Sequence, residues 1–391
     1  MTSMSKNTIF AIAVRECRRM TSRPLYLFCM MIAPALVFIF FTTMMSDGLP
    51  TGIPAAVVDE DNTSVTRQII RNLDAFQQTK IIAHYNSFAE AREAMQRGEI
   101  YAFYYIPKGS TEQALASRQP VVSFYTAASY IIPASLEYRD MKMMSEYASG
   151  AVTRATLYAQ GLTEQQAMAV LQPITIEMHP LNNPRLNYSV YLCNTMLPGI
   201  LMLLILQVTI FSIYGEIKEE TAGEWLSLSN NNIIKALTGK LLPQFIIWLI
   251  MTLLYMMIMY GYYKFPLNCS FMTMLLPATL LILASQGLAI FICAMVPSLR
   301  WALSLATLWG VLSFPISGFS FPYMAFPSSM KALSYLFPLR HYFMIYASQA
   351  LNGLSWHYTW LNYALLLFFI ILPLFVINRL KTFLLEYHYT I

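Results

Sequence analysis

The sequence predicts an α-helical membrane protein with six transmembrane helices plus an extracytoplasmic α/β (α+β) domain. Six stretches are apolar enough to cross a membrane, each close to the ~20 residues that ~30 Å of hydrocarbon requires. They are 25–45, 189–213, 241–263, 271–296, 302–321 and 358–378. The polar segment 46–186 separates the first stretch from the other five and is long enough to form its own core. The chain is 57% hydrophobic and 12% charged, whereas soluble domains contain about 25% charged residues.

The segment 1–24 is expected to form a cytoplasmic amphipathic elbow helix before the first transmembrane helix at 25–45. Within 6–20, one side of a helix would carry apolar residues and the opposite side charged ones. The apolar residues are Ile9, Phe10, Ala13, Val14 and Cys17, and the charged ones are Arg15, Glu16, Arg18 and Arg19. Such a helix lies in the membrane interface. It acts either as a topogenic anchor or as an elbow that packs against a partner subunit.

Charge distribution predicts the orientation in the cytoplasmic (inner) membrane. The basic residues before the first span place the N-terminus in the cytoplasm, and the span is too long for a cleavable signal. Counting onward, the segments 46–186 and 322–357 lie outside, whereas loop 214–240 and the C-terminus lie inside. Among the basic residues of the short connections and the C-terminal segment, six then lie inside and three lie outside. Those inside are Lys218, Lys235, Lys240, Arg300, Arg379 and Lys381, and those outside are Lys264, Lys331 and Arg340.

The outer domain alternates predicted strands with predicted helices. Strands are expected at 55–58, 80–85, 100–106 and 121–125, and a long helix at 133–160. This alternation favours a small α/β or α+β sheet. The domain contains no cysteine, so it is expected to fold without a disulfide.

An acidic cluster, Asp59-Glu60-Asp61-Asn62, follows the first predicted strand. It either precedes a helix cap at Asn62, Thr63 or Ser64 or binds a divalent cation. The calcium-loop spacing is absent, which favours the cap. The chain also lacks G-x-S-x-G and H-E-x-x-H motifs, and no basic run with interleaved aromatics suggests nucleic acid. We therefore expect no catalytic site, no metal site and no nucleic-acid partner in this chain.

The most informative motif follows the second span, within the predicted cytoplasmic loop 214–240. Its acids surround a tryptophan and a leucine, which suits docking into a groove on a soluble partner, with the tryptophan as anchor and the acids as rim. A plain solvated loop would account for the charges but not for Trp225. The candidate docking residues are Glu216, Lys218, Glu219, Glu220, Glu224, Trp225 and Leu226.

At these residues the chain resembles the permease subunits of type-2 ABC transporters with a large outer domain between spans one and two. The matching residues of the loop are Lys218-Glu219, Glu224, Leu226, Ser229 and Gly239-Lys240. Further matching stretches are 337–342 with 349–353, and 54–59. The family's Gly-Thr step is Thr221-Ala222 here, and its proline after Ser229 is Asn230.

The resemblance implies a division of labour. Two permeases would pair as a homo- or heterodimer, and cytoplasmic ATPase subunits would bind ATP and magnesium and push on the 215–238 loop. This chain would hold no cofactor, because Gly239-Lys240 is followed by leucine and lacks the upstream glycine of a Walker A motif. Periplasmic adaptor or envelope proteins are candidate further partners.

The segment 322–357 contains three prolines and is too broken to span, and the family places short re-entrant helices there. Arg340 and His341 are candidates for a gate or a contact with an anionic headgroup, or else for a plain role at the outer interface. Spans two and five are candidates for the substrate path, at Leu203, Thr307 and Ser313.

The leading hypothesis is a permease subunit of an exporter for an amphipathic or lipid-like substrate, since the spans lack the ionisable groups that ion and proton couplers use. A membrane-anchored sensor or scaffold, whose outer domain binds an envelope partner or ligand, is the alternative. A proton-coupled secondary transporter ranks third for the same lack of charges.

Overall fold

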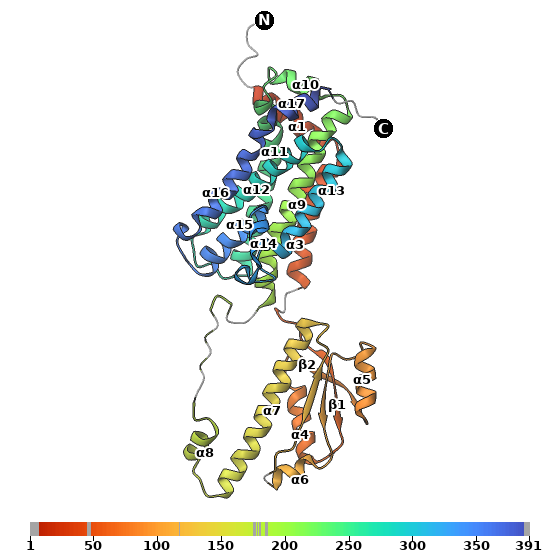
Figure 1. Ribbon diagram of the computed structural model, residues 1–391, viewed down its shortest axis with the longest axis vertical. Helices are drawn as coiled ribbons and strands as arrows, with labels where there is room; N and C mark the ends of the chain where they lie inside the picture. Colours follow the sequence, from red (N-terminus) through yellow and green to blue (C-terminus); the bar gives the residue numbers. More distant parts are fainter. Residues whose placement is uncertain are drawn as a thin grey trace. The chain divides into compact units, whose positions relative to one another are not determined.

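The chain folds into two compact units, which we call the helical unit and the α/β unit. The computed structural model describes residues 8–44, 48–116, 118–174, 177, 179, 181–183 and 187–386. The helical unit comprises Met1–Ser46 and Leu181–Ile391, and the α/β unit comprises Asp47–Pro180. Residues 1–7 of the expected elbow segment lie outside the described part. Figure 1 shows both units with their element labels.

The described residues of the helical unit include six helices long and apolar enough to cross a membrane, which confirms the predicted number. They are Pro24–Met44, Tyr188–Lys218, Ile233–Tyr262, Phe271–Met295, Leu299–Ile316 and Trp356–Phe375. Several combine shorter elements, because α-helical turns alternate with π-helical or 3-10 turns. The first comprises α2 (Pro24–Leu27), η1 (Phe28–Ile32) and α3 (Ala33–Met44), and the third comprises α11 (Ile233–Met256) and η2 (Met257–Tyr262).

The second, fourth and fifth spans are the single helices α9 (Tyr188–Lys218), α12 (Phe271–Met295) and α13 (Leu299–Ile316), and the sixth comprises η5 (Trp356–Thr359), α16 (Trp360–Ile371) and η6 (Leu372–Phe375). The other elements of the helical unit are α1 (Thr8–Thr21), α10 (Ala222–Leu228), η3 (Tyr323–Ala325), α14 (Ser328–Ser334), α15 (Pro338–Ile345), η4 (Tyr346–Leu351) and α17 (Ile377–Glu386). The segment 322–357 thus contains only short helices, none of which is long enough to span a bilayer.

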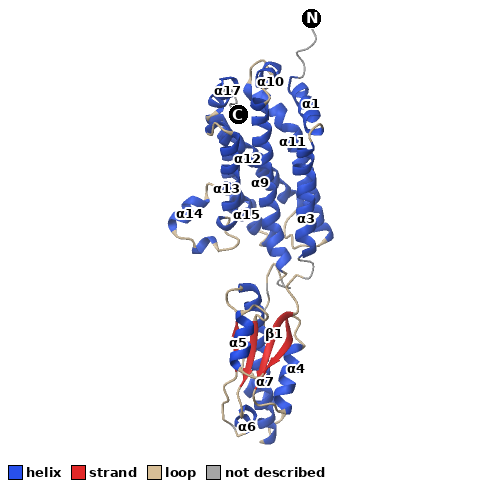
Figure 2. Ribbon diagram, turned by 90° about the vertical axis from the view of Figure 1, so that its right-hand side faces the viewer, coloured by secondary structure: helices blue, strands red, loops and turns tan. Residues whose placement is uncertain are grey.

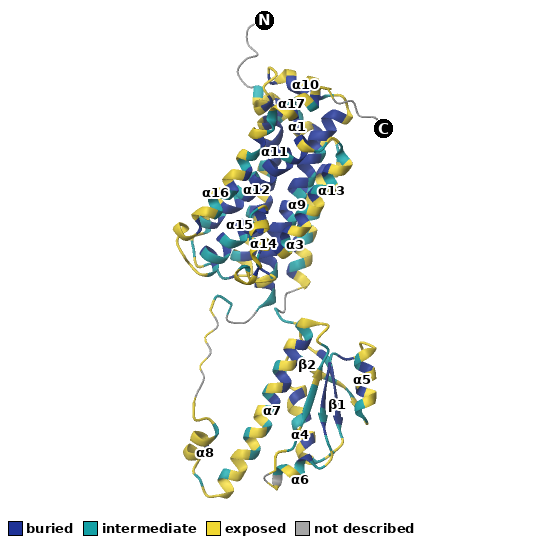
Figure 3. Ribbon diagram, viewed as in Figure 1, coloured by how far each residue is buried: buried dark blue, intermediate teal, exposed yellow. Residues whose placement is uncertain are grey.

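Helices α9 and α12 lie at the centre of the helical unit, and the other spans surround them (Figures 1 and 3). Their spanning windows are 67% and 72% buried, against 28% for α13. Gly287 of α12 allows a close approach to α16, because a Cβ there would lie 2.3 Å from the carbonyl oxygen of Phe369. The less buried outer spans would expose apolar side chains to lipid.

The α/β unit is a four-stranded sheet with helices on both faces (Figure 2). The strands are β1 (Ile53–Asp59), β2 (Thr79–Tyr85), β3 (Ala102–Ile106) and β4 (Ser123–Thr126), in the order β2-β1-β3-β4. The β1–β2 and β1–β3 pairs are parallel, and β3–β4 is antiparallel. The helices are α4 (Ser64–Asp74), α5 (Phe88–Gln96), α6 (Ser110–Leu115), α7 (Ile131–Ala159) and α8 (Glu164–Leu171).

Strand β1 is apolar throughout because helices cover both sides of it. Ala55 and Val57 pack in one core with residues of α4 and α7, whereas Ala56 and Val58 pack in a second core with residues of α5. The two cores account for the continuous Ala-Ala-Val-Val run that predicted this strand.

The acidic cluster 59–62 at the end of β1 leads into the N-terminus of a helix, as predicted. Thr63 is the N-cap of α4, and its hydroxyl accepts a hydrogen bond from the backbone nitrogen of Thr66. The carboxylate of Asp59 accepts bonds from the Thr66 hydroxyl, 2.6 Å away, and from the backbone nitrogen of Asn62. Asp61 accepts bonds from the backbone nitrogens of Gly109 and Thr111. Asp59 therefore stabilises the N-terminus of α4, and Asp61 stabilises the loop that precedes α6.

Candidate functional site

Helix α1 buries two of its charged residues in the helical unit and leaves several of its apolar residues exposed. Glu16 is 1% exposed and Arg19 is 9% exposed, whereas Phe10 is 66% and Val14 is 44% exposed. This arrangement suits a helix that lies in a membrane interface, with its apolar side toward lipid. The charged side must then find partners inside the protein, because unpaired buried charges are costly.

Close packing against α11 holds α1 in place. Gly239 of α11 has no side chain, and a Cβ there would lie 2.9 Å from the carbonyl oxygen of Ile9 and 2.8 Å from the Cβ of Ile12. No other residue type fits this crossing without displacing α1. The two residues of the Gly239-Lys240 pair therefore act together. The glycine allows α1 to pack closely against α11, and the lysine forms an ion pair with a carboxylate of α1.

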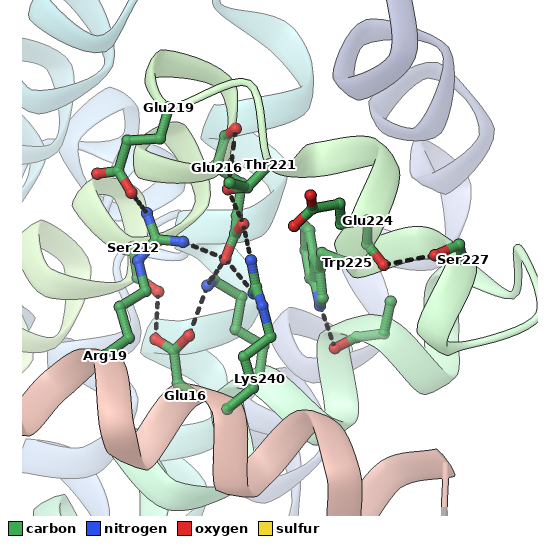
Figure 4. A network of polar contacts seen from close by, with 12 residues as sticks. Glu16, Arg19, Ser212, Glu216, Glu219, Thr221, Glu224, Trp225, Ser227 and Lys240 are labelled. Carbon is green, nitrogen blue, oxygen red and sulfur yellow. Dashed lines mark hydrogen bonds and ion pairs between the residues drawn. The ribbon is translucent and has the colours of Figure 1, made fainter. Parts of the chain in front are cut away.

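Glu216, at the end of α9, is the centre of a buried polar network (Figure 4). Arg15 binds it with two parallel bonds, Nη1 to Oε1 and Nη2 to Oε2, both 2.8 Å. The ammonium of Lys240 donates to Oε1 at 2.6 Å, and Arg19 forms a further ion pair with the same oxygen. The hydroxyl of Thr221 donates to Oε2. The fully buried carboxylate is thus satisfied on both oxygens.

Glu16 of α1 forms the second half of this network. Its Oε2 accepts a bond from Lys240 at 2.7 Å. Its Oε1 accepts bonds from the hydroxyl of Ser212 at 2.9 Å and from the amide of Gln244 at 3.1 Å. Gln244 also donates to Ser212. Lys240 consequently bridges a carboxylate of α1 and a carboxylate of α9.

Glu219 extends the network toward the surface. Its carboxylate accepts a bond from Arg19 at 3.0 Å and pairs with Arg23. The hydrogen bonds that Arg15 donates to Glu216 raise the pKa of Arg15, and those that Arg23 donates to Glu219 raise the pKa of Arg23. These arginines therefore remain charged throughout the physiological range.

Four cations and three carboxylates thus join α1, the end of α9 and α11, and the hydroxyl of Thr221, the N-cap residue of α10, bonds to the same set. Removing one partner from such a buried set leaves an uncompensated charge, at a cost of about 3–5 kcal/mol. The four elements should therefore move together rather than independently. We call these residues the buried network: Arg15, Glu16, Arg19, Arg23, Ser212, Glu216, Glu219, Thr221, Lys240 and Gln244.

Helix α10 departs from the expected docking loop. Trp225 and Leu226 were expected as an exposed anchor, but both are fully buried. The indole nitrogen of Trp225 donates to the carbonyl oxygen of Ala236, and Lys240 lies 5.1 Å from its ring centroid. Glu216 likewise lies in the buried network rather than in a polar rim. Trp225 and Leu226 hold α10 against its neighbours, because packing there removes both apolar side chains from water.

The other side of α10 is exposed. Of the candidate docking residues, Lys218, Glu219, Glu220 and Glu224 reach the surface. Leu228, which the sequence analysis did not single out, lies beside them and is 40% exposed. Asn230 and Asn231 adopt positive φ angles of 55° and 59°, which reverse the chain between α10 and α11.

The candidate path residues lie where α9 meets α13. Leu203 fills the space above Gly310, where a Cβ would lie 2.5 Å from its Cδ1 atom. Thr307 is exposed, and its hydroxyl accepts a bond of 2.6 Å from the amide of Gln207. Ser313 is buried, and its hydroxyl donates to the carbonyl oxygen of Trp309. Of the three, only Thr307 is openly accessible.

Arg340 and His341 are not surface residues. They are 3% and 0% exposed, respectively, at the start of α15. This burial is inconsistent with a plain interfacial role, in which both side chains would reach water or headgroups freely.

Sequence reasoning did not identify the buried network as a site. Arg15, Glu16 and Arg19 were assigned to the polar side of an interfacial helix, and Ser212 and Gln244 were not considered. One signal was present. Opposite charges adjoin three different apolar stretches, at 15–23, 216–219 and 240, and charges at span margins on one side of a membrane can meet.

The spans and the inserted α/β unit define a multi-pass membrane protein with an α/β unit after its first span. The chain belongs to the ABC-2 family of transporter proteins, whose sequence model matches residues 24–378. Members are membrane subunits of ABC transporters, with the ATPase in a separate subunit. Helix α1 precedes the matched range. No curated protein matches this sequence.

Proposed function

We propose that this chain is the permease subunit of an ATP-driven exporter of an amphipathic or lipid-like substrate. It would pair with a second permease in the cytoplasmic (inner) membrane, with both termini in the cytoplasm. ATP and magnesium would bind to a partner ATPase, and this chain would hold no cofactor. The observation that carries the proposal is the buried network, which joins α1, α9 and α11 and reaches α10 through its N-cap residue, Thr221.

Rigidity explains how the network would serve transport. The exposed face of α10, with Glu224 and Leu228, offers acids and an apolar side chain to an ATPase. The buried face of α10, with Trp225 and Leu226, is fixed to the helices around it. A displacement of α10 would therefore move the ends of α9 and α11 together, and two spans would respond to one push.

The substrate class follows from where the charges lie. Charged residues of the candidate spans are near span ends, as Glu216, Lys218, Lys235, Lys240 and Arg300 illustrate. Ion-coupled transporters place ionisable groups at mid-membrane, where they are costly and functional. An apolar pathway suits an amphiphile, whose tail can follow the helix surfaces.

Polar groups on the outside of α13 support pairing with a second permease. Ser304 and Thr307 are exposed there, next to Gln207 of α9. Such groups favour contact with another protein surface or a pathway over contact with lipid tails. The seam between α9 and α13 is therefore our candidate for the side that faces the second permease.

The direct test is transport in reconstituted vesicles that contain this chain and its co-purifying ATPase. We expect efflux of a fluorescent amphiphile that requires ATP and stops when the catalytic glutamate of the ATPase is replaced. Efflux without ATP would contradict the proposal and favour a secondary transporter. An ATPase-free complex that binds an envelope partner through the α/β unit would favour a sensor or scaffold.

The orientation has its own test in a cysteine-free background. Cysteines at Gln77 and Gln119, both exposed in the α/β unit, should react with an impermeant maleimide on intact cells. A cysteine at the exposed Lys218 should react only after permeabilisation. The reverse pattern would overturn the proposed orientation.

A further inference from the structure

Arg340 is a buried cation held by aromatic rings. It is 3% exposed, and its guanidinium carbon lies 4.4 Å from the ring centroid of Tyr323 and 4.2 Å from that of Tyr335. The two tyrosine hydroxyls are 3.3 Å apart. Cation–π contacts offset part of the cost of burying a charge, but they do not neutralise it.

His341 orients this guanidinium. Its Nε2 lies 3.0 Å from the carbonyl oxygen of Tyr335, which can only accept, so Nε2 carries a proton. Burial lowers the pKa of His341, and the neutral ring then has a lone pair on Nδ1. That lone pair accepts a bond from Nη1 of Arg340 at 3.3 Å. Oδ1 of Asn362 lies 3.1 Å from the same Nδ1, and because two acceptors repel each other, the Asn362 amide would turn its nitrogen toward the ring.

A counter-ion for Arg340 is missing from its surroundings. Among the described residues, no carboxylate forms an ion pair with Arg340, and its Nε has no hydrogen-bond partner. The sequence explains why no acid is available nearby, since no Asp or Glu occurs between Glu224 and Glu386. Lys331 adds a second cation, 5.8 Å from the Tyr323 ring. Spans three to six and their loops thus provide cations but no acid at this position.

A buried arginine with donors to spare is incomplete without an anion. Isolated buried charges cost far more than ring contacts return. The planar fork of arginine matches phosphate and carboxylate oxygens with two parallel bonds. Of the two tyrosine hydroxyls, the one whose proton is not used in the bond between Tyr323 and Tyr335 adds a donor beside it. We propose that Arg340, with Tyr323, Tyr335 and Lys331, forms a binding site for a phosphate group, such as the head of an anionic amphiphile.

In this site Arg340 binds the anion and His341 is a positioning residue, because it contacts the guanidinium rather than the anion. Phosphate fits better than a single carboxylate, since it offers enough oxygens for both Arg340 and Lys331. The same chemistry is found in a lipid headgroup and in free phosphate. The site does not depend on ATP-driven transport, so failure of one proposal leaves the other intact.

The test is calorimetric titration of the purified, delipidated full-length chain with three probes. These are short-chain phosphatidic acid, short-chain phosphatidylcholine and inorganic phosphate. We expect Arg340→Gln to weaken phosphatidic acid binding about tenfold or more. The matched control is Lys264→Gln, which removes one positive charge at an exposed position of the same acid-free part of the chain. This control should change affinity less than about twofold.

The probes separate the sources of the anion. Binding of phosphatidic acid without binding of inorganic phosphate supports a lipid headgroup, and equal binding of both supports free phosphate. Wild-type protein that binds neither, or that binds phosphatidylcholine equally well, overturns the site without any variant. Equal losses in Arg340→Gln and Lys264→Gln also overturn it. If Arg340→Gln does not fold, Arg340→Lys keeps the charge but lacks the fork, and unchanged affinity in that variant contradicts the proposed geometry.

Discussion

The ammonium nitrogen of Lys240 lies 2.6 Å from Oε1 of Glu216, and both side chains are fully buried. Glu16 shares this lysine from α1. A buried ion pair adds little net stability relative to apolar residues, but removing one partner is costly because the remaining charge is neither paired nor hydrated. The pair therefore specifies how α1, α9 and α11 meet, and it makes that arrangement sensitive to single substitutions.

Replacing Glu216 by glutamine should destabilise the helical unit. Arg15, Arg19 and Lys240 would lose their shared carboxylate, and we expect a cost of about 3–5 kcal/mol. The measurement is the thermal midpoint in detergent, followed by tryptophan fluorescence. Glu220→Gln is the matched control, since it is the same chemical change at an exposed position of the same segment. Equal midpoints for the two variants would show that the network contributes no stability.

Adding one methyl group at Gly239 should loosen α1. The Cβ of Gly239→Ala would lie 2.9 Å from the carbonyl oxygen of Ile9, so α1 must shift. We expect this shift to lower the free energy of unfolding by about 1–3 kcal/mol. Trypsin should then cleave α1 faster at Arg15 and Arg18. Gly223→Ala is the control, because nothing lies within 4 Å of a Cβ there. Identical cleavage rates would mean that close packing at Gly239 does not hold α1.

Docking of an ATPase should depend on the exposed face of α10. Glu224→Lys combined with Leu228→Asp should weaken co-purification of the ATPase about tenfold or more while leaving the thermal midpoint unchanged. By contrast, Trp225→Ala should lower stability by about 3–5 kcal/mol, because the indole is fully buried. Undiminished binding by the double variant, measured by pull-down, would remove this face from the interface.

Much of the architecture could be predicted from local patterns. The six apolar stretches identify the spans, because membrane thickness fixes helix length. The Ala-Ala-Val-Val run identifies β1, and a cap expected at Asn62, Thr63 or Ser64 identifies the start of α4, because both signals depend on neighbours in sequence. These predictions are confirmed.

The site was harder to predict because it depends on contacts between distant residues. Arg15 and Glu216 are 201 residues apart, and Lys240 and Glu16 are 224 apart. Amphipathicity indicates that α1 has a charged side but not what that side contacts. Trp225 among acids suggested exposure, whereas its indole is buried against α11. Composition cannot separate a docking anchor from a core residue when the helix has both kinds of neighbour.

The α/β unit should lose stability as the pH rises. Glu137 of α7 is fully buried, and among the described residues neither carboxylate oxygen has a hydrogen-bond partner. Burial, and then the nearby Asp140 carboxylate, raises the pKa of Glu137 from 4.5 to about 8. The folded state therefore keeps a proton that the unfolded state releases. Between these values the free energy of unfolding should fall with pH, by up to about 1.4 kcal/mol per unit.

The measurement is the urea midpoint of the α/β unit in the full-length chain, followed by pulse proteolysis between pH 6 and 8. Glu137→Gln cannot ionise, so it should flatten the pH dependence and raise the midpoint at the alkaline end. Glu146→Gln, an exposed position on the same helix, should retain the wild-type slope. A slope that persists in Glu137→Gln would assign the pH dependence to another group.

A charge on the outside of α13 should block transport without unfolding the chain. Leu203→Arg is a poor test, because Leu203 packs against Gly310 within the subunit and its loss would disturb that contact. Thr307 is exposed beside Gln207, so Thr307→Arg should insert stably and abolish ATP-driven efflux if the seam between α9 and α13 lines the pathway. Leu312 is 41% exposed on another side of the same helix, so Leu312→Arg introduces the same charge there and controls for the cost of membrane insertion. Full efflux by a stably inserted Thr307→Arg protein would exclude this seam. A loss of efflux in Thr307→Arg but not in Leu312→Arg would assign the pathway to the polar side of α13.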